Sequence, residues 1–463
     1  MAKERRAKQT DFTSGPIIKP LLLFSIPLVL GDLFNALYNV VDTIVVGQYV
    51  GAGALAAVGC CFAITMVCVS VFAGFGMGSG ILTAQMVGAK REDQLTATIN
   101  TAYIGGFIVG TTMIIVGEIT AVPLLRLLKT PESIMGMATQ YLRIFLLGCT
   151  GQLFYYMGSS MLRGMGDSKW PTYALVFCAV LNIVLDLIFV VAFHWDCAGV
   201  AAATVISQLI SGIAVLIRVY KGGYGIKVTK ENFRIDPQIL KMILRIGIPG
   251  GLNMLVTSAG MLVIQRFANS FGETLVAANS IIQKIDSFAM LPIMSLCTAL
   301  TTFVGQNLGA GEEKRCDEGM KKITVIVVLL GLFIGVVGFF VGGLFCRIFV
   351  KDISVIAIGR EAIRILAFFY AAYGLGMSLS YTIEGAGATK PVMIISIVNI
   401  MVRVALCYLL AIRTGRWQGM FWATAVTFII NMIIYLLYTW KGNWKKYVQV
   451  QRETDETQEE PAF

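Results

Sequence analysis

The sequence predicts an all-α polytopic membrane protein with twelve transmembrane helices. Hydrophobic residues make up 57% and charged residues 14% of its 463 residues, and the mean hydropathy is +0.76, whereas soluble domains are about 25% charged. Apolar runs of about 20 residues, enough to cross a hydrocarbon core of about 30 Å, recur along the chain. The chain also repeats itself at an offset of about 221 residues. Runs this long exclude a β-barrel, whose strands alternate over about ten residues.

The expected spans divide into two sets of six. The first set comprises residues 21–47, 54–80, 95–120, 135–158, 173–193 and 199–220. The second set comprises residues 242–267, 276–303, 323–346, 362–382, 392–412 and 419–440. Because each set is even in number, both halves enter the membrane from the same side, related by an axis along the membrane normal. We therefore expect a parallel repeat of two six-helix lobes.

Matching segments carry the repeat. RGMGDSK at 163–169 corresponds to EGAGATK at 384–390, and QMVGA at 85–89 corresponds to QNLGA at 306–310. Gly51 likewise corresponds to Gly272 at the same offset. In membrane proteins a repeat of this kind is a mark of transporters, whose substrate lies between the halves.

The expected organisation follows the repeat. It comprises an N-terminal segment (1–20), an N lobe (21–220), a linker (221–241), a C lobe (242–440) and a tail (441–463). The net charge of +10 comes mainly from Lys and Arg between spans, on the side that holds both termini. This bias predicts a multi-pass membrane protein with both termini cytoplasmic. Contact with anionic lipid is a secondary consequence, and nucleic-acid binding is not expected.

Cysteine and histidine usage gives no sign of a metal centre. Most of the ten cysteines fall inside spans without CxxC spacing, which is typical of small buried hydrophobic residues. The one histidine, His194, has no second histidine near it. The glycine-rich run at 74–80 lacks the context of a phosphate loop and predicts close helix packing or a flexible helix end. We expect no cofactor and no metal other than Na⁺ as a coupling ion.

The first span carries a stripe of polar side chains. Its members fall within about 120° of one face at 100° per residue. They are Asp32, Asn35, Tyr38, Asn39 and Asp42. A carboxylate at membrane depth is costly and usually faces a cavity or a pathway. We therefore expect the stripe to face the protein interior.

Two further spans place oxygen-bearing side chains at the depth of Asp42. Asn182 and Asp186 lie four residues apart on one face of the fifth span. Thr204 lies in the sixth span, one turn before Gln208. Distances from the span ends place Asp42, Asp186 and Thr204 about 7–12 Å below the outer surface. Oxygen ligands suit Na⁺, and paired carboxylates suit H⁺, so the cluster predicts a cation site. The alternative is hydrogen bonding within helix packing, with no ion.

The repeat provides an internal comparison for this cluster. Asp42 falls on about Ile264, and Asp186 falls on Arg403, so the C half has lost both carboxylates and gained a cation. A requirement of the scaffold should appear in both halves, whereas a local ion site need not. The comparison favours a cation site in the first half alone.

The C half has its own intramembrane charges. Asp286 lies in the eighth span, Arg266 near the end of the seventh and Arg403 in the eleventh. Either arginine has the charge to pair with Asp286, and the sequence does not choose between them. We interpret the three as a polar network of structural ion pairs.

Each half has a proline early in its first span, Pro27 and Pro249. A proline inside a helix removes a backbone hydrogen bond and kinks the helix. The matched pair predicts a conformational hinge in each half, and fixed bends are the equal alternative.

Several stretches carry a resemblance to a known family. Residues 26–59 read IPLVLGDLFNALYNVVDTIVVGQYVGAGALAAVG, and residues 304–311 read VGQNLGAG. Together with the paired RGMGDSK and EGAGATK turns, they resemble the multidrug and toxic compound extrusion (MATE) transporters over about residues 20–440. The resemblance implies two six-helix lobes in a V shape and cation-coupled export of bulky, often cationic organic compounds.

The resemblance is strongest to a prokaryotic branch with the SOS-linked, DinF-type members. In that branch it implies a cation site built from an aspartate in helix 1, an Asn-x-x-x-Asp pair in helix 5 and a threonine in helix 6. The matching residues here are Asp42, Asn182, Asp186 and Thr204. Tyr141 in the fourth span corresponds to a family tyrosine near that site. The other branch keeps acidic residues in helices 7 and 8, and here only Asp286 is of that kind.

The expected function is an antiporter that exports small organic compounds in exchange for H⁺ or Na⁺, working as a monomer among membrane lipids. The residues expected to line its substrate cavity are Asp32, Asn35, Tyr38, Asn39, Tyr141 and Gln208. Asp32 is outside the family pattern, and it either attracts cationic substrates or only lines the cavity. One rival is a flippase for lipid-linked saccharides, which would need a cationic cavity for pyrophosphate. The other is an intramembrane enzyme, which the lack of HExxH and GxSxG disfavours.

Overall fold

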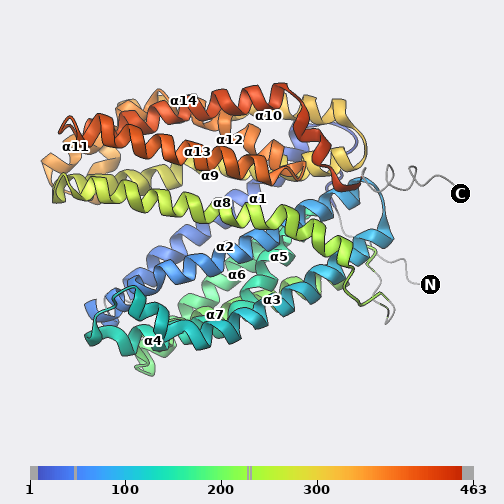
Figure 1. Ribbon diagram of the computed structural model, residues 1–463, viewed down its shortest axis with the longest axis horizontal. Coiled ribbons are helices and arrows are strands. Elements are labelled where there is room, and N and C mark those ends of the chain that lie inside the picture. The colour runs from blue at the N-terminus through green and yellow to red at the C-terminus, as the bar shows by residue number, and fades with distance from the viewer. Residues whose placement is uncertain (1–8, 46–48, 227–228, 230–231, 451–463) are drawn as a thin grey trace, which may run out of the picture. The chain divides into compact units, whose positions relative to one another are not determined.

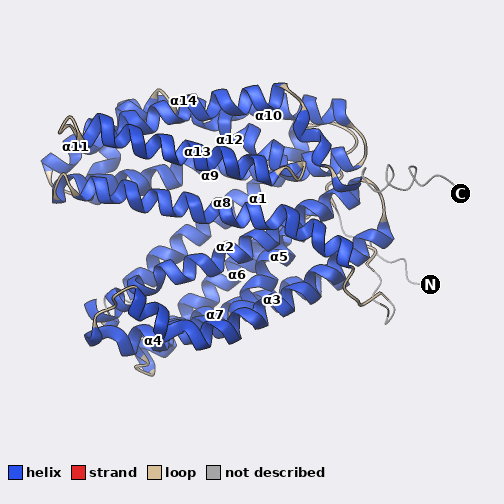
Figure 2. Cartoon of the chain, viewed as in Figure 1, coloured by secondary structure: helices blue, strands red, loops and turns tan. Residues whose placement is uncertain are grey.

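The computed structural model describes residues 9–45, 49–226, 229 and 232–450, and for residues 38–45 and 52 it describes the backbone alone. Over these residues the chain forms helices and loops, without a strand (Figure 2). Helices satisfy the backbone N–H and C=O groups internally, as a membrane requires. The predicted all-α class is therefore confirmed.

The helices follow one another in two matching series (Figure 1). The first series is α1 (Ile18–Val45), α2 (Ala52–Gly88), α3 (Glu92–Leu127), α4 (Glu132–Leu147), α5 (Cys149–Gly164), α6 (Lys169–Asp186), η2 (Leu187–Ala192) and α7 (Asp196–Lys221). The second series is α8 (Pro237–Asn269), α9 (Glu273–Gly309), α10 (Glu313–Phe349), α11 (Ile353–Ala367), α12 (Tyr370–Gly385), α13 (Thr389–Cys407), η3 (Tyr408–Ile412) and α14 (Gln418–Trp440). A short 3₁₀ helix, η4 (Asn443–Tyr447), follows α14.

Ten helices in the described part of the chain have the length and hydropathy of membrane spans. The remaining two predicted spans, 135–158 and 362–382, are each formed by two consecutive helices, α4–α5 and α11–α12. α4 and α5 have 16 residues each, about 24 Å at 1.5 Å per residue. Each alone is too short for a core of about 30 Å. Two of the twelve spans are therefore jointed, which hydropathy does not reveal.

The two series repeat the same backbone turns. Gly51 before α2 has a φ of 103°, and Gly272 before α9 has a φ of 95°. In the turns before α6 and α13, Gly166 has a φ of 85° and Gly387 a φ of 88°. Residues with a Cβ atom rarely adopt such angles. The glycines that the sequence repeats are thus those that the repeated turns require.

Contacts between residues divide the chain into two compact units. The N unit comprises the residues up to Asp11 and Ile26–Gly251, and the C unit comprises Phe12–Ser25 and the residues from Leu252 onward. This is a division by contacts, whereas the expected lobes are a division by sequence repeat. It cuts α1 one residue before Pro27 and α8 two residues after Pro249. Both repeated prolines therefore lie beside a boundary between units.

Helix packing is alike in the two units. α2 packs on α5 and α6 on α7 in the N unit, and their counterparts α9 on α12 and α13 on α14 in the C unit. A Cβ on Gly164 would lie 2.6 Å from the carbonyl oxygen of Gly80, and a Cβ on the repeat partner Gly385 would lie 2.7 Å from that of Thr301. The sequence repeat is therefore also a repeat of tertiary packing.

The glycine-rich run in α2 lies against the first half of α8, within the N unit. A Cβ on Gly74 would lie 2.5 Å from the carbonyl oxygen of Gly247, and one on Gly251 would lie 2.6 Å from that of Ser70. Real side chains do not tolerate such distances, so the two backbones touch only because these positions lack a Cβ. The expectation of close helix packing for this run is confirmed.

Candidate cation site and its surroundings

Two of the residues predicted to bind a cation, Asn182 and Asp186, lie where α6 gives way to a π-helical segment. α6 ends at Asp186, and in η2 the N–H of Phe193 donates to the carbonyl of Ile188, five residues back, over 3.0 Å. Segments of this kind occur frequently at functional sites. Asn182 and Asp186, one α-helical turn apart, are 1% and 0% exposed.

Three members of the predicted cluster contact one another in the N unit. With its amide nitrogen toward Asp186, Asn182 donates to Asp186 Oδ2 over 2.9 Å, and its oxygen accepts the Thr204 backbone N–H over 3.1 Å. The Thr204 hydroxyl lies 3.3 Å from the same amide group. A buried carboxylate is costly unless a proton or a cation neutralises it. The arrangement of carboxylate, amide and hydroxyl therefore suits the binding of a small cation.

Asp42, the fourth predicted member, has a side chain that lies outside the described residues, as do Tyr38 and Asn39. The backbone of α1 continues as a helix through all three positions to Val45. The role of these three residues stays a prediction.

Asp32 and Asn35, predicted to line a substrate cavity, lie on α1 of the N unit, and both are exposed. The charge of Asp32 acts on Arg163, near the end of α5. Asp32 is therefore not an isolated carboxylate at this depth, and a basic side chain partly offsets its charge.

The other two predicted cavity residues lie on α7 and α4. Gln208 follows Thr204 by one turn of α7, and its Oε1 atom is buried without a hydrogen-bond partner among the described residues. Tyr141 on α4 is half-buried, and its ring stacks on that of Phe145 with the ring centres 6.5 Å apart. Both belong to the N unit, which also holds Asn182, Asp186 and Thr204, and their role in substrate binding stays a prediction.

The backbone of Pro27 is hydrogen-bonded to α6, the helix that carries Asn182 and Asp186. The Thr172 hydroxyl of α6 donates to the Pro27 carbonyl over 2.9 Å. One turn further along α1, Gly31 packs on the same helix, where a Cβ would lie 3.3 Å from Leu175 Cδ2. Proline has no N–H, so the α1 hydrogen-bond ladder is interrupted at this point. α6 therefore holds α1 where α1 can bend most easily.

The C unit has an arginine in place of the second carboxylate. Arg403 Nη2 on α13 donates to Thr424 Oγ1 on α14 over 2.9 Å. Asp286 Oδ1 on α9 accepts from the Tyr370 hydroxyl over 2.5 Å, and the charges of Asp286 and Arg403 act on one another. Arg266 lies exposed in the last turn of α8. The partner Tyr370 was not indicated by the sequence.

Comparison with known proteins gives the family. The MatE profile matches the chain twice, over residues 27–188 and 249–409. The chain belongs to the MATE family. It is 32% identical over 449 residues to the probable multidrug resistance protein YpnP of Bacillus subtilis strain 168, covering 95% of this chain and 98% of that protein.

Further relatives agree with this assignment to the MATE family. The multidrug export protein MepA of Staphylococcus saprophyticus is 22% identical over 430 residues, covering 92% of this chain and 95% of that protein. The crystal structure of MATE in complex with MaL6 matches with a TM-score of 0.88 at 25% identity, covering 95% of this chain and 99% of that one. MATE proteins are transporters, so the predicted transporter class is confirmed and an intramembrane enzyme is excluded. The two profile matches also coincide with the sequence repeat.

In this MATE protein, we expect Thr172→Val to slow transport by about two- to tenfold, because it removes one hydrogen bond of about 0.5–1.5 kcal/mol from the Pro27 carbonyl. Thr172→Ser keeps the hydroxyl and should transport at the wild-type rate. Initial rates of dye efflux from cells would be compared at equal membrane expression. Equal rates for the valine and serine variants would show that the hydrogen bond between Thr172 and Pro27 does not affect the bending of α1 during transport.

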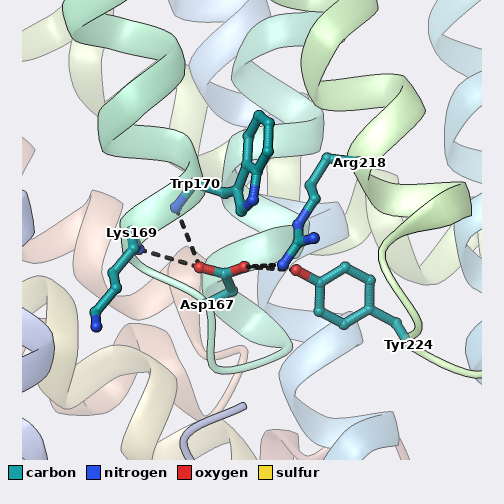
Figure 3. Close-up of polar contacts among 5 residues, drawn as sticks. All are labelled: Asp167, Lys169, Trp170, Arg218 and Tyr224. Carbon is teal, nitrogen blue, oxygen red and sulfur yellow. Dashed lines mark hydrogen bonds and ion pairs between the residues drawn. The ribbon is translucent and has the colours of Figure 1, made fainter. Parts of the chain in front are cut away.

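A polar cluster surrounds Asp167 in the turn before α6 (Figure 3). The sequence did not predict it as a site. Asp167 Oδ1 accepts the backbone N–H groups of Lys169 and Trp170, each over 3.1 Å, and so caps α6. Its Oδ2 accepts from Arg218 Nη2 over 3.2 Å and from the Tyr224 hydroxyl over 2.5 Å. Burial raises the pKa of the Tyr224 phenol, and the hydrogen bond to Asp167 raises it further. The cluster ties the end of α7, and the segment after it, to this turn.

A difference between the repeats could have drawn attention to this cluster. Asp167 falls on Ala388 in the second copy, so the turn is repeated but its carboxylate is not. Similarly, Arg163 falls on Glu384, a carboxylate that is 7% exposed in the C unit. Positions where one copy carries a charge and the other does not, or where the sign reverses, mark the features particular to one half.

Proposed function

We propose that this MATE transporter exports small, often cationic organic compounds in exchange for H⁺ or Na⁺, by alternating access across a bacterial cell membrane with both termini cytoplasmic. The observation that carries the proposal is the contact among Asn182, Asp186 and Thr204 in the N unit, where the first two are buried and Thr204 is half-buried. The arginine at the repeat position of Asp186 supports it, because a purely structural carboxylate would be expected in both halves.

The cation is proposed to bind Asp186 with Asn182, Thr204 and Asp42. Binding neutralises the buried carboxylate and so removes the penalty for closing the N unit around it. The Thr172 hydroxyl connects the same helix to the Pro27 carbonyl, so a shift of α6 would change the bend of α1. A membrane potential of 100 mV adds roughly 2.3 kcal/mol per charge that crosses it fully.

The substrate is proposed to bind near the exposed face of α1 that carries Asp32 and Asn35. The names of relatives, a multidrug resistance protein and a multidrug export protein, support small organic compounds as a class. Asp32 would attract cationic compounds, and the nearby positive charge of Arg163 would keep that attraction moderate. Moderate attraction suits export, because a substrate that binds too tightly is released slowly.

Efflux from proteoliposomes tests this proposal, with a pH gradient and a Na⁺ gradient imposed separately. We expect a cationic dye to leave faster under one of the two gradients than with neither. Polyprenyl-linked saccharide in the same vesicles serves as the comparison for a flippase. The proposal would be contradicted if the rate of dye efflux did not depend on either gradient. It would also be contradicted if only the lipid-linked saccharide moved, at a rate independent of both gradients.

A further inference from the structure

The C unit repeats the surroundings of the N-unit cation cluster but not its charge. Both fifth spans end in π-helical segments, and in η3 the N–H of Arg413 donates to the carbonyl of Tyr408, five residues back, over 2.9 Å. Asn399 and Arg403 lie four residues apart on α13, as Asn182 and Asp186 do on α6. Asp186 directly precedes η2, whereas Arg403 lies five residues before η3, so the two units share the same elements and corresponding residues without the same spacing to the π-helical segment.

The guanidinium of Arg403 contacts the hydroxyl that corresponds to Thr204. In the N unit Thr204 lies 3.3 Å from the Asn182 amide, and in the C unit Thr424 Oγ1 accepts from Arg403 Nη2 over 2.9 Å. Arg403 Nε is buried without a hydrogen-bond partner among the described residues. A positive group thus lies, in the C unit, beside the hydroxyl that the N unit offers to a cation.

The charge of Arg403 also acts on a carboxylate of the C unit, Asp286, without a direct hydrogen bond between the two side chains among the described contacts. Asp286 accepts a hydrogen bond from the hydroxyl of Tyr370, which carries no positive charge. The positive charge that acts on Asp286 is that of Arg403. Asp286 and Tyr370 border a cavity of about 150 Å³. The rest of its lining is apolar and includes Phe333, Val337, Phe345 and Ile363. This lining supplies no second cation for Asp286.

We propose that Arg403 is a built-in cation, which takes in the C unit the part that the coupling ion takes in the N unit. The proposal rests on the proposed function of the N-unit cluster. A covalently attached charge does not dissociate, so the C unit stays neutralised at every ion concentration. Only the N unit then responds to the gradient, and Arg403 determines that the transporter has one coupling site and not two.

The test restores a carboxylate at position 403 after the N-unit site has been removed. The apparent unfolding temperature of purified protein in detergent is measured against Na⁺, with choline at constant ionic strength, and separately against pH. We expect Asp186→Asn to lose the wild-type response to the coupling ion. The double variant Asp186→Asn, Arg403→Asp should regain a response of comparable size, because it recreates the Asn-x-x-x-Asp pair beside Thr424. Asp186→Asn, Arg403→Lys keeps a cation and should show none.

A folded double aspartate variant that responds to neither ion would overturn the proposal. If that variant does not fold, Arg403→Gln in the wild-type background decides. It should unfold at a lower temperature than Arg403→Lys and be stabilised by added Na⁺ or by acid, because Asp286 has lost its counter-charge. Equal behaviour of the glutamine and lysine variants would overturn the proposal as well. A full ion response in Asp186→Asn alone would instead reject the proposed N-unit site.

Discussion

Asp186→Asn should reduce ion-driven efflux at least tenfold, which corresponds to about 1.4 kcal/mol of lost cation binding. The substitution keeps the size of the side chain and removes the charge that a buried cation requires. The side chain is 0% exposed and accepts a hydrogen bond from Asn182, so water cannot replace the missing charge. Initial rates in proteoliposomes under an imposed gradient measure the effect.

Asp196→Asn is the matched control for this experiment. It makes the same change of carboxylate to amide ten residues further along the chain, at an exposed position in the first turn of α7. Its efflux should equal that of the wild type. Thr204→Ala should lie between the two, since it removes one neutral ligand of the proposed site. Unaltered ion dependence in Asp186→Asn would mean that the contact with Asn182 serves helix packing.

The second large effect is expected on stability, from Asp167→Ala. The substitution removes the cap from two N–H groups of α6 and leaves Arg218 and Tyr224 without their shared acceptor. A lost cap costs about 1 kcal/mol, and breaking a mostly buried ion pair costs up to about 3–5 kcal/mol. Because Arg218 is 25% exposed, we expect a total of about 2–3 kcal/mol. The apparent unfolding temperature in detergent should fall by several degrees.

Two further variants separate the contributions within this cluster. Asp167→Asn can still cap α6 but loses the charge that Arg218 requires, so its loss should be intermediate. Lys445→Ala breaks ion pairs of the C unit with Glu313 and Asp317, whose side chains are 52% and 39% exposed. Exposed pairs contribute about 0–1 kcal/mol, so this variant should unfold near the wild-type temperature. An Asp167→Ala protein as stable as Lys445→Ala would show that the cluster does not hold the turn.

The fold was predictable because a membrane narrows the choice. A chain with long apolar runs must satisfy its backbone within helices, and the sequence repeat shows how the helices group. The joint at Gly148 was not predictable in the same way. A Cβ there would lie 2.6 Å from Val205 Cγ2, a contact between α4 and α7 that hydropathy does not measure.

The candidate site was predictable to the extent that it is local. Helical periodicity alone places Asn182 and Asp186 on one face, and the repeat identifies Arg403 as the odd member of its pair. The hydrogen bond between Asp286 and Tyr370 joins residues 84 positions apart on α9 and α12. No local sequence pattern around either residue indicates that the other is its hydrogen-bond partner. Contacts of this kind depend on how the helices pack, which a single sequence does not specify.

The π-helical segments after Asp186 and near Arg403 have a consequence for chain length. A segment with hydrogen bonds from residue i to i−5 holds one residue more than an α-helix of the same extent. Deleting one residue from η2 would let the ladder return to the i−4 pattern, and because the wider turn absorbs the extra residue within the same extent, the residues beyond it would keep their orientation relative to Asp186. In each half the fifth span therefore accommodates one extra residue close to the position of Asp186 or Arg403 without a change in the direction of the span.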